Sequence, residues 1–330
     1  MAEYFRKENC KYDVTALGEL LVDMIQAGVS EQGNKTFEAN PGGAPCNVLS
    51  MLTKLGNRTC FIGNVGDDMF GRDLADAAAQ VGIDTAGIHF DPDCNTTLAL
   101  VHKLADGDRD FSFYRKPGAD MMLTPENTDT ELIRQCRIFH FGSLSLTSEP
   151  VRSATVKALQ TAKESGCLIS FDPNLREPLW PDMDLAREQI AYGISVCDFL
   201  KISDNEIQWF TGEEDYDRGI QVLQSEYSPR LICLSMGSEG SRAYMGGPEY
   251  VEVPAFLQDT TIETTGAGDC FNGCVLHYLL HHDIDALTPE MLEEMLTMAN
   301  AAASIVTTRK GALRSMPEDA EIKALIRGGR

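Results

Sequence analysis

Residues 136–174 read CRIFHFGSLSLTSEPVRSATVKALQTAKESGCLISFDPN. Two short apolar runs, 136–143 and 167–174, flank a longer segment at 148–166 that opens with Ser-Glu and closes with Gly. Apolar runs that lead into polar residues are typical of buried strands, and the start and stop of the middle segment are typical of a helix. A strand, a helix and a second strand at this spacing predict parallel strands joined by a right-handed crossover.

The same arrangement continues toward the C-terminus. CDFLKIS (197–203) and RLICLSMG (230–237) repeat the strand pattern, and MDLAREQIAYGISV (183–196) repeats the helix pattern. The predicted fold class is therefore α/β, with a doubly wound, mostly parallel sheet sandwiched by helices. Ligands in such sheets bind beyond the carboxyl ends of the strands. No internal repeat or Pro-rich linker divides the chain, so residues 1–330 are predicted to form a single domain.

One region departs from this alternation. TTLALVHKLADGDRDFSFYR (96–115) consists of two strand-length runs joined by Ala-Asp-Gly-Asp, which predicts a hairpin without a covering helix. Residues 20–40 are similarly irregular. We therefore expect a small β-lid from roughly 20–40 and 95–118, which serves either to cover a site or as an association surface.

Composition excludes several classes of protein. The net charge of −22 argues against a nucleic-acid surface, because phosphate backbones are bound by an excess of Lys and Arg. No window reaches the roughly 18 uninterrupted apolar residues of a membrane span, and the N-terminus lacks the apolar run of a signal peptide. The 10 cysteines include no CxxC pair, which favours reduced thiols and a cytoplasmic protein.

The segment ETTGAGDCFNG (263–273) carries the strongest chemical signal. Gly266, Ala267 and Gly268 allow successive backbone amides to point into one concavity before an apolar helix, which is an anion hole. Asp269 follows at the same turn. It is explained either as a helix cap or as the acceptor of a hydroxyl proton during phosphoryl transfer, and the motif alone leaves both open.

A second signal lies in NPGGAPCNVLSMLTKLG (40–56). Gly42 and Gly43 permit close approach of the backbone to a ligand, and Asn47 offers a donor and an acceptor near a predicted helix start. Asp23, in LGELLVDMI, is predicted to be a carboxylate at the end of a first strand. Taken alone, these features are better explained as an ordinary turn before a helix and an edge or loop acid.

Together these segments resemble the ribokinase-like, PfkB-type carbohydrate kinases over nearly the full length. Within that family FYRKPGADMML (113–123), FHFGSLSL (139–146) and FDPNLREPLWPD (171–182) are similar to fructokinases. The resemblance implies an α/β sandwich with a β-lid that often forms a dimer interface. It also implies ATP-dependent phosphorylation of a free sugar, D-fructose giving fructose 6-phosphate. The absence of a Walker motif fits, because the family holds phosphate on the GAGD backbone instead.

The resemblance also assigns roles to residues of this chain. It matches the catalytic base to Asp269, with the anion hole at Gly266, Ala267 and Gly268. Positions expected to contact the substrate are Asp23, Gly42, Gly43, Asn47, Arg115 and Arg176. Positions expected to contact ATP are Ser235, Gly237, Gly240, Thr265 and Asn300. Mg²⁺ is assigned to Glu206 through water, and a monovalent cation such as K⁺ to Glu263, Thr265, Val306, Gly311 and Ser315.

The chain departs from the family pattern at two of these places. Glu263 stands where relatives commonly have Asp, which puts the monovalent cation in question, and Ser203 replaces the first Asn of the NxxE motif that contains Glu206. Other activities also remain open. A kinase for 2-keto-3-deoxygluconate, ribose or a nucleoside would differ by a few side chains, and a sugar-binding regulator without catalysis could use the same fold.

Overall fold

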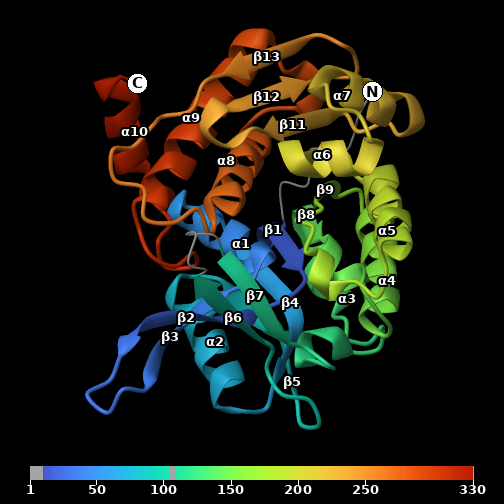
Figure 1. The fold of residues 1–330 in the computed structure, drawn as a ribbon. Coiled ribbons are helices and arrows are strands. Elements are labelled where there is room, and N and C mark those ends of the chain that lie inside the picture. The colour runs from blue at the N-terminus through green and yellow to red at the C-terminus, as the bar shows by residue number, and fades with distance from the viewer. Residues whose placement is uncertain (1–9, 104–108, 330) are drawn as a thin grey trace.

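The computed structural model describes residues 10–103 and 109–329. Its main element is a 9-stranded sheet with the order β13-β12-β11-β10-β9-β8-β1-β4-β5 (Figure 1). The strands of this sheet are β1 (Tyr12–Leu17), β4 (Thr59–Gly66), β5 (Asp84–Asp91), β8 (Cys136–Gly142), β9 (Leu168–Asp172), β10 (Phe199–Ser203), β11 (Leu231–Ser235), β12 (Ser241–Tyr244) and β13 (Tyr250–Val253).

All neighbours from β11 to β5 are parallel, and only β12 and β13 add antiparallel pairs at one edge. The chain builds outward from β1 in both directions, because β1 pairs with β4 on one side and with β8 on the other. This arrangement confirms the predicted doubly wound, mostly parallel sheet. The four strands predicted at 136–143, 167–174, 197–203 and 230–237 are β8, β9, β10 and β11.

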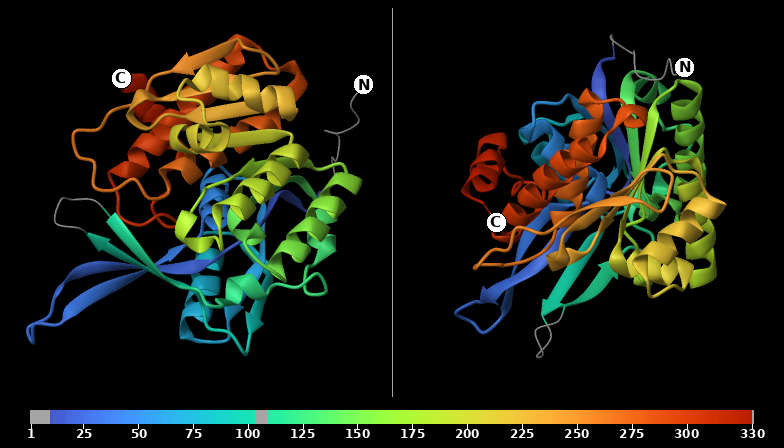
Figure 2. Two further views of the ribbon diagram at one scale, coloured as in Figure 1. Left: turned by 45° about the vertical axis from the view of Figure 1, so that its right-hand side comes forward. Right: turned by 90° about the horizontal axis from the view of Figure 1, so that it is seen from above.

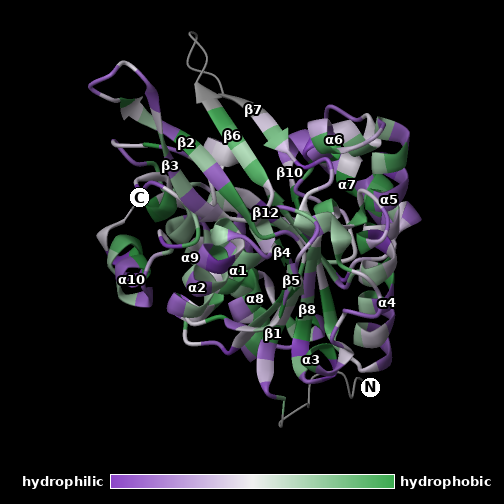
Figure 3. Ribbon diagram, turned by 90° about the horizontal axis from the view of Figure 1, so that it is seen from below, coloured by the Kyte–Doolittle hydropathy of each residue, from purple (hydrophilic) through white to green (hydrophobic). Residues whose placement is uncertain are grey.

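Helices cover both faces of the sheet (Figures 1 and 2). One face packs against α1 (Ala44–Lys54), α2 (Met69–Gln80), α8 (Ala267–His281), α9 (Pro289–Thr307) and α10 (Asp319–Gly328). The other packs against α3 (Thr130–Arg134), α4 (Val151–Glu164), α5 (Met183–Val196), α6 (Asp204–Thr211) and α7 (Tyr216–Glu226). The apolar strands therefore lie between two hydrophobic cores, with the polar side of the helices outward (Figure 3). In the described parts of the chain, no helix is long and apolar enough to cross a membrane.

A 4-stranded sheet with the order β3-β2-β6-β7 projects from the main body (Figure 2). Its strands are β2 (Leu21–Val29), β3 (Lys35–Gly42), β6 (Leu98–Lys103) and β7 (Arg109–Tyr114). Two antiparallel hairpins, β2 with β3 and β6 with β7, are joined by the parallel pair β2 and β6. We call this sheet the lid. The turn predicted at Ala-Asp-Gly-Asp lies outside the described residues.

One expectation about the lid segments was wrong in detail. Residues 20–40, assigned to the lid, contain β2 and most of β3, which form a hairpin with an irregularity in the register between Gln26 and Gly28. Asp23 lies in β2 of the lid rather than at the end of the first strand, since β1 ends at Leu17. Only Gly18 and Glu19 interrupt the apolar residues at this change of sheet. It occurs just after Gly18, where a Cβ would lie 2.6 Å from the Cγ atom of Pro45, so the chain passes close to the start of α1.

Helices α1 and α8 pack closely together, and this contact places two candidate site residues opposite each other. Gly273 lies at the contact, where a Cβ would be 2.7 Å from the Cβ atom of Met51. The missing side chain lets the two helix axes approach. Asn47 on α1 and Asp269 on α8 are consequently within hydrogen-bonding distance.

Candidate active site

Helix α8 begins at a residue in the left-handed conformation. Gly266 has φ 80° and precedes the first helical residue, Ala267. No side chain caps this helix start, and the amide of Ala267 donates to the carbonyl of Thr264 at 3.2 Å. The amides that follow therefore remain available to a ligand at the positive end of the helix dipole. Asp269 does not cap the helix, which removes the first of the two explanations for its position.

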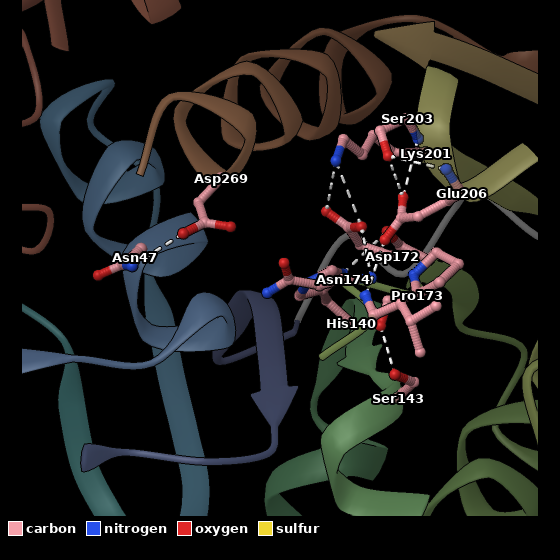
Figure 4. A network of polar contacts seen from close by, with 12 residues as sticks. Asn47, His140, Ser143, Asp172, Pro173, Asn174, Lys201, Ser203, Glu206 and Asp269 are labelled. Carbon is pink, nitrogen blue, oxygen red and sulfur yellow. Dashed lines mark hydrogen bonds and ion pairs between the residues drawn. The ribbon is translucent and has the colours of Figure 1, made fainter. Parts of the chain in front are cut away.

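The carboxylate of Asp269 is held by α1 instead. The Nδ2 atom of Asn47 donates to Oδ2 of Asp269 at 2.8 Å (Figure 4). The other end of the same amide, Oδ1 of Asn47, is buried and has no partner among the described residues. A buried acceptor without a donor is rare in a native protein and indicates a ligand or water that donates to it. Asn47 thus presents one unsatisfied acceptor beside a fixed carboxylate.

Burial raises the pKa of Asp269 above its ordinary value. The hydrogen bond from Asn47 and the positive charges of Lys201 and Arg176 act in the opposite direction and keep the shift smaller. A carboxylate with a raised pKa is a stronger base than one in water. This environment suits a group that accepts a proton.

Asp23 approaches the same space from the lid. A Cβ on Gly42 would lie 2.2 Å from Oδ2 of Asp23, so a side chain at this position would displace the carboxylate from its present place. Gly43 has φ 122° and no room for a side chain, because a Cβ would lie 2.4 Å from the carbonyl oxygen of Glu19. Glu19 was not among the expected site residues. The Oε1 atom of Glu19 accepts from the amide of Ala44 at 2.9 Å and so stabilises the first turn of α1.

Lys201 is the most informative residue that sequence reasoning missed. Its Nζ atom lies 3.2 Å from Oδ2 of Asp172, and both side chains are buried (Figure 4). A Cβ on Gly268 would lie 3.3 Å from the same nitrogen, which places the ammonium group directly beside the first turn of α8. A lone cation in the apolar strand CDFLKIS was the available signal, because a lysine is rarely buried without a partner.

Lys201 is positively charged. Burial lowers the pKa of its ammonium group, but the carboxylates of Asp172, Glu206 and Asp269 outweigh this and raise the pKa above the ordinary value. A fixed positive charge therefore stands beside the open start of α8. In a protein of net charge −22 this combination supplies a local anion-binding site.

Two cavities meet at this point. The lid cavity, of about 690 Å³, is lined by Asp269 and by four of the residues expected to contact substrate, namely Asp23, Gly43, Asn47 and Arg176, whereas Gly42 does not line it. The α9 cavity, of about 630 Å³, is lined by most of those expected to contact a nucleotide, namely Ser235, Gly237, Gly240 and Asn300. Thr265 lines the lid cavity rather than the α9 cavity. Both cavities share the walls formed by Asn174, Arg176, Lys201, Thr264 and Gly268.

Asn300 holds a wall of the α9 cavity in place. Its Nδ2 atom donates to the carbonyl of Val253 at 2.9 Å, and its Oδ1 atom accepts from Ser241 at 2.9 Å. The amide therefore ties α9 to β12 and to the end of β13. Its contribution in this structure is to shape the cavity.

The two arginines expected near substrate lie in different environments. Arg176 is exposed, lines both cavities, and is near enough to Asp23 and Asp269 to oppose the rise of their pKa values. Arg115 lines neither cavity. It is buried in an ion pair with Asp120 at 2.7 Å, so the expectation that it faces substrate does not match its position. The family resemblance matched the position of Arg115 but could not show that Asp120 is its partner.

Glu206 is held at the start of α6. Its Oε2 atom accepts from the amide and the hydroxyl of Ser203, both at 2.8 Å, in a capping box, and Oε1 accepts from the amide of Leu175 at 2.8 Å. The replacement of the first Asn of the NxxE motif by Ser203 is therefore accommodated as a helix cap. With its oxygens already engaged, Glu206 suits a metal held through water better than a directly bound one. In residues 10–103 and 109–329, no group of three or more His, Cys, Asp or Glu side chains could hold a metal.

Several residues expected around a monovalent cation lie together. Oε1 of Glu263 accepts from the amide of Gly311 at 2.7 Å, and the hydroxyl of Ser315 donates to the carbonyl of Gly311 at 2.8 Å. Val306 lies near the end of α9, two residues before its C-cap. The longer Glu263 side chain reaches the Gly311 loop and bonds its backbone there.

Residues 11–319 match the pfkB family of carbohydrate kinases. The chain is 40% identical over 320 residues to probable fructokinase-2 of Arabidopsis thaliana, covering 95% of each protein.

The chain belongs to the pfkB family of carbohydrate kinases.

Solved structures of this family have the same fold. A fructokinase from Xylella fastidiosa with bound ATP superposes with a TM-score of 0.87 at 30% identity, covering 96% of this chain and 98% of that chain. A fructokinase from Vibrio cholerae O395, in a form with fructose, ADP and calcium ion bound, gives a TM-score of 0.85 at 30% identity, covering 95% and 99%.

We predict that replacing Asp23 changes how stability depends on pH. Burial raises the pKa of Asp23 to about 7, opposed by Arg176 and reinforced by Asp269 and Glu263, whereas an unfolded Asp has a pKa of about 3.9. Between these values the native state binds a proton that the unfolded state lacks, so Asp23 makes stability fall as pH rises from about 4 to about 7. Asp23→Asn should therefore gain stability relative to the wild type across that window.

The measurement is urea unfolding of both proteins at intervals from pH 4.5 to 8, with the exposed Asp259→Asn as a matched control. The control should follow the wild-type curve. A constant difference between Asp23→Asn and the wild type over the whole range would contradict the assigned pKa.

Proposed function

We propose that this protein transfers the γ-phosphoryl group of ATP to the 6-hydroxyl group of D-fructose. The observation that carries the proposal is the position of Asp269, which stands in the first turn of α8 where the lid cavity and the α9 cavity meet. A sugar in the first cavity and ATP in the second would meet beside this carboxylate. The fructokinases to which the chain is similar, including the ATP-bound and fructose-bound structures, support this choice.

The residues of the site have two roles, to accept the proton of the hydroxyl group and to stabilise the charge of the phosphoryl group. Asp269, oriented by Asn47, accepts the proton of the attacking hydroxyl. The turn from Gly266 to Gly268 and the ammonium group of Lys201 stabilise the negative charge of the phosphoryl group during transfer. Mg²⁺ usually binds through one or two carboxylates together with substrate phosphates, and it neutralises phosphate charge when bound. Glu206, with both oxygens engaged, would hold it through water.

The lid is proposed to exclude water from the reaction. Ile25, Val101 and Phe113 of the lid line the lid cavity together with Asp23. Apolar side chains over the reacting hydroxyl would keep water, a competing acceptor of the phosphoryl group, away from ATP.

The charges around the lid cavity favour a neutral sugar over an acid sugar. Besides Asp269, the carboxylates that line this cavity are Glu19, Asp23, Glu38 and Glu263. Among the described residues, Lys310 is the one lining cation away from the wall shared with the α9 cavity, and Arg115 is withdrawn by its ion pair with Asp120. Arg176 lies on the wall shared with the α9 cavity, on the side that the phosphates of ATP would occupy. Above about pH 7, where Asp23 is ionised, the carboxylate of 2-keto-3-deoxygluconate would therefore meet mostly like charges, at a cost that fructose avoids.

Replacing the base should strongly reduce turnover and spare sugar binding. Asp269→Asn keeps the shape of the side chain but cannot accept the hydroxyl proton, so we expect a fall in kcat of about 10²-fold to 10⁴-fold. The fructose Kd from calorimetry should change by no more than a few-fold. Asp215→Asn, at the exposed N-cap of α7, is the matched control and should keep wild-type kcat. Near-normal turnover of Asp269→Asn would remove the proposed base.

A panel of acceptors measured by ADP release decides the substrate. We expect the highest kcat/KM for D-fructose, with lower values for ribose, nucleosides and 2-keto-3-deoxygluconate. A preference for one of the others would overturn the substrate, while the kinase chemistry would stand. Sugar binding without ADP formation would instead indicate a regulator without catalysis.

We further propose that the protein is cytoplasmic and pairs as a homodimer through the lid. The strands β3 and β7 form the two edges of the lid sheet, and edge strands readily pair with another chain. No disulfide joins cysteines in the described part of the chain, which suits a reducing compartment. Light scattering should give twice the chain mass of 36.2 kDa, and a single-chain mass would contradict the dimer.

A further inference from the structure

Arg115 and Asp120 form a buried ion pair away from both cavities. Their side chains are 2% and 1% exposed, and Nε of Arg115 lies 2.7 Å from Oδ2 of Asp120. The remaining guanidinium nitrogens donate to the hydroxyl of Thr147 at 3.1 Å and to the carbonyl of Leu144 at 3.1 Å. Each of the three guanidinium nitrogens therefore has an acceptor within the protein. Arg115 is engaged by the fold and is not available to a ligand.

This ion pair stands at the root of the lid. Arg115 directly follows β7, and Thr97 directly precedes β6. The hydroxyl of Thr97 donates to Oδ1 of Asp120 at 2.5 Å. The carboxylate of Asp120 therefore binds one residue next to β6, Thr97, and one next to β7, Arg115. Gly118 lies against the same group, because a Cβ there would be 1.8 Å from the Thr97 hydroxyl. Through Thr147 and Leu144 the pair ties the hairpin to the body of the protein.

The same contacts lead into the lid cavity. The carbonyl of Thr97 accepts from the amide of Val22 at 3.1 Å, one residue before Asp23. Asp23 itself pairs with Ala99 in the register of β2 and β6. Leu144, whose carbonyl is bound by Arg115, lines the lid cavity. The position of Asp23 relative to the body therefore depends on the contacts made by the ion pair.

We propose that Arg115 and Asp120 are positioning residues that fix the lid over the lid cavity and so set the place of Asp23 for the sugar. The proposal rests on the proposed function, since it assigns the sugar to this cavity. A buried ion pair is stable only when its geometry and hydrogen bonds are complete, and removal of one partner leaves an uncompensated charge. The complete set of hydrogen bonds around Arg115 and Asp120 therefore favours one orientation of the lid where β6 and β7 join the body of the protein.

The experiment compares the effect of each variant on the KM for the sugar with its effect on the KM for ATP. Thr147→Val removes one acceptor of Arg115 and keeps both charges. The paired variant Arg115→Met with Asp120→Leu removes both charges at once, which avoids an unpaired buried charge. For each variant we expect the KM for the sugar to rise by about tenfold or more, a loss of at least about 1.4 kcal/mol, with the KM for ATP within about twofold.

Hydrogen exchange in the protein without ligands gives a readout independent of chemistry. In both variants the amides of β2 and β6 should exchange faster than in the wild type, while those of β9 and β10 should not. Thr161→Val is the matched control, because Thr161 is also buried but bonds only within α4. The control should leave both KM values and the exchange of the lid unchanged.

Two results would overturn the proposal. One is a folded paired variant with an unchanged sugar KM and unchanged lid exchange, and the other is an equal rise of the sugar and ATP KM values. If the paired variant does not fold, Thr147→Val decides by the same criteria. If the wild type phosphorylates no sugar, the proposed function fails, and the exchange of the lid in the ligand-free protein still decides the role of the ion pair.

Discussion

The left-handed conformation of Gly266 lets α8 begin without a side-chain cap, and the chemistry proposed for this protein depends on that start. Because no side chain caps the first turn, its amides and the positive end of the helix dipole remain available to a phosphate. The side chain of Asp269, which does not cap the helix, instead accepts a hydrogen bond from Asn47 on α1. The close packing of α1 and α8 at Gly273 brings these two side chains together.

An acidic protein that binds ATP needs its positive charge in one place. Lys201 supplies it beside Gly268, where Asp172 holds the ammonium group and the surrounding carboxylates keep it charged. Arg176 adds a second cation on the wall common to both cavities. The lid cavity beyond is lined by carboxylates, which bind sugar hydroxyls as acceptors and oppose an acidic substrate. The cations therefore mark the part of the site expected to bind phosphate, and the carboxylates mark the part expected to bind the sugar.

Much of the fold could be predicted from the sequence, because the signals are local. The apolar runs of β8 to β11 and the bounded helix between residues 148 and 166 needed only nearby residues, and the glycines before Asp269 likewise indicated an anion hole. The rest depends on partners distant in the chain. Lys201 acquires its role from Asp172 and Gly268, which belong to other elements, and Arg115 acquires its role from Asp120 and Thr147. In the sequence, the change of sheet between Leu17 and Leu21 is marked only by Gly18 and Glu19 within an otherwise apolar stretch.

The most direct test is a crystal structure of the protein with fructose and a non-hydrolysable ATP analogue. The account predicts the 6-hydroxyl oxygen of fructose at about 2.6–3.2 Å from a carboxylate oxygen of Asp269, with the terminal phosphate between the first turn of α8 and Lys201. Fructose bound with its 6-hydroxyl group away from Asp269, or the terminal phosphate outside that turn, would contradict the account.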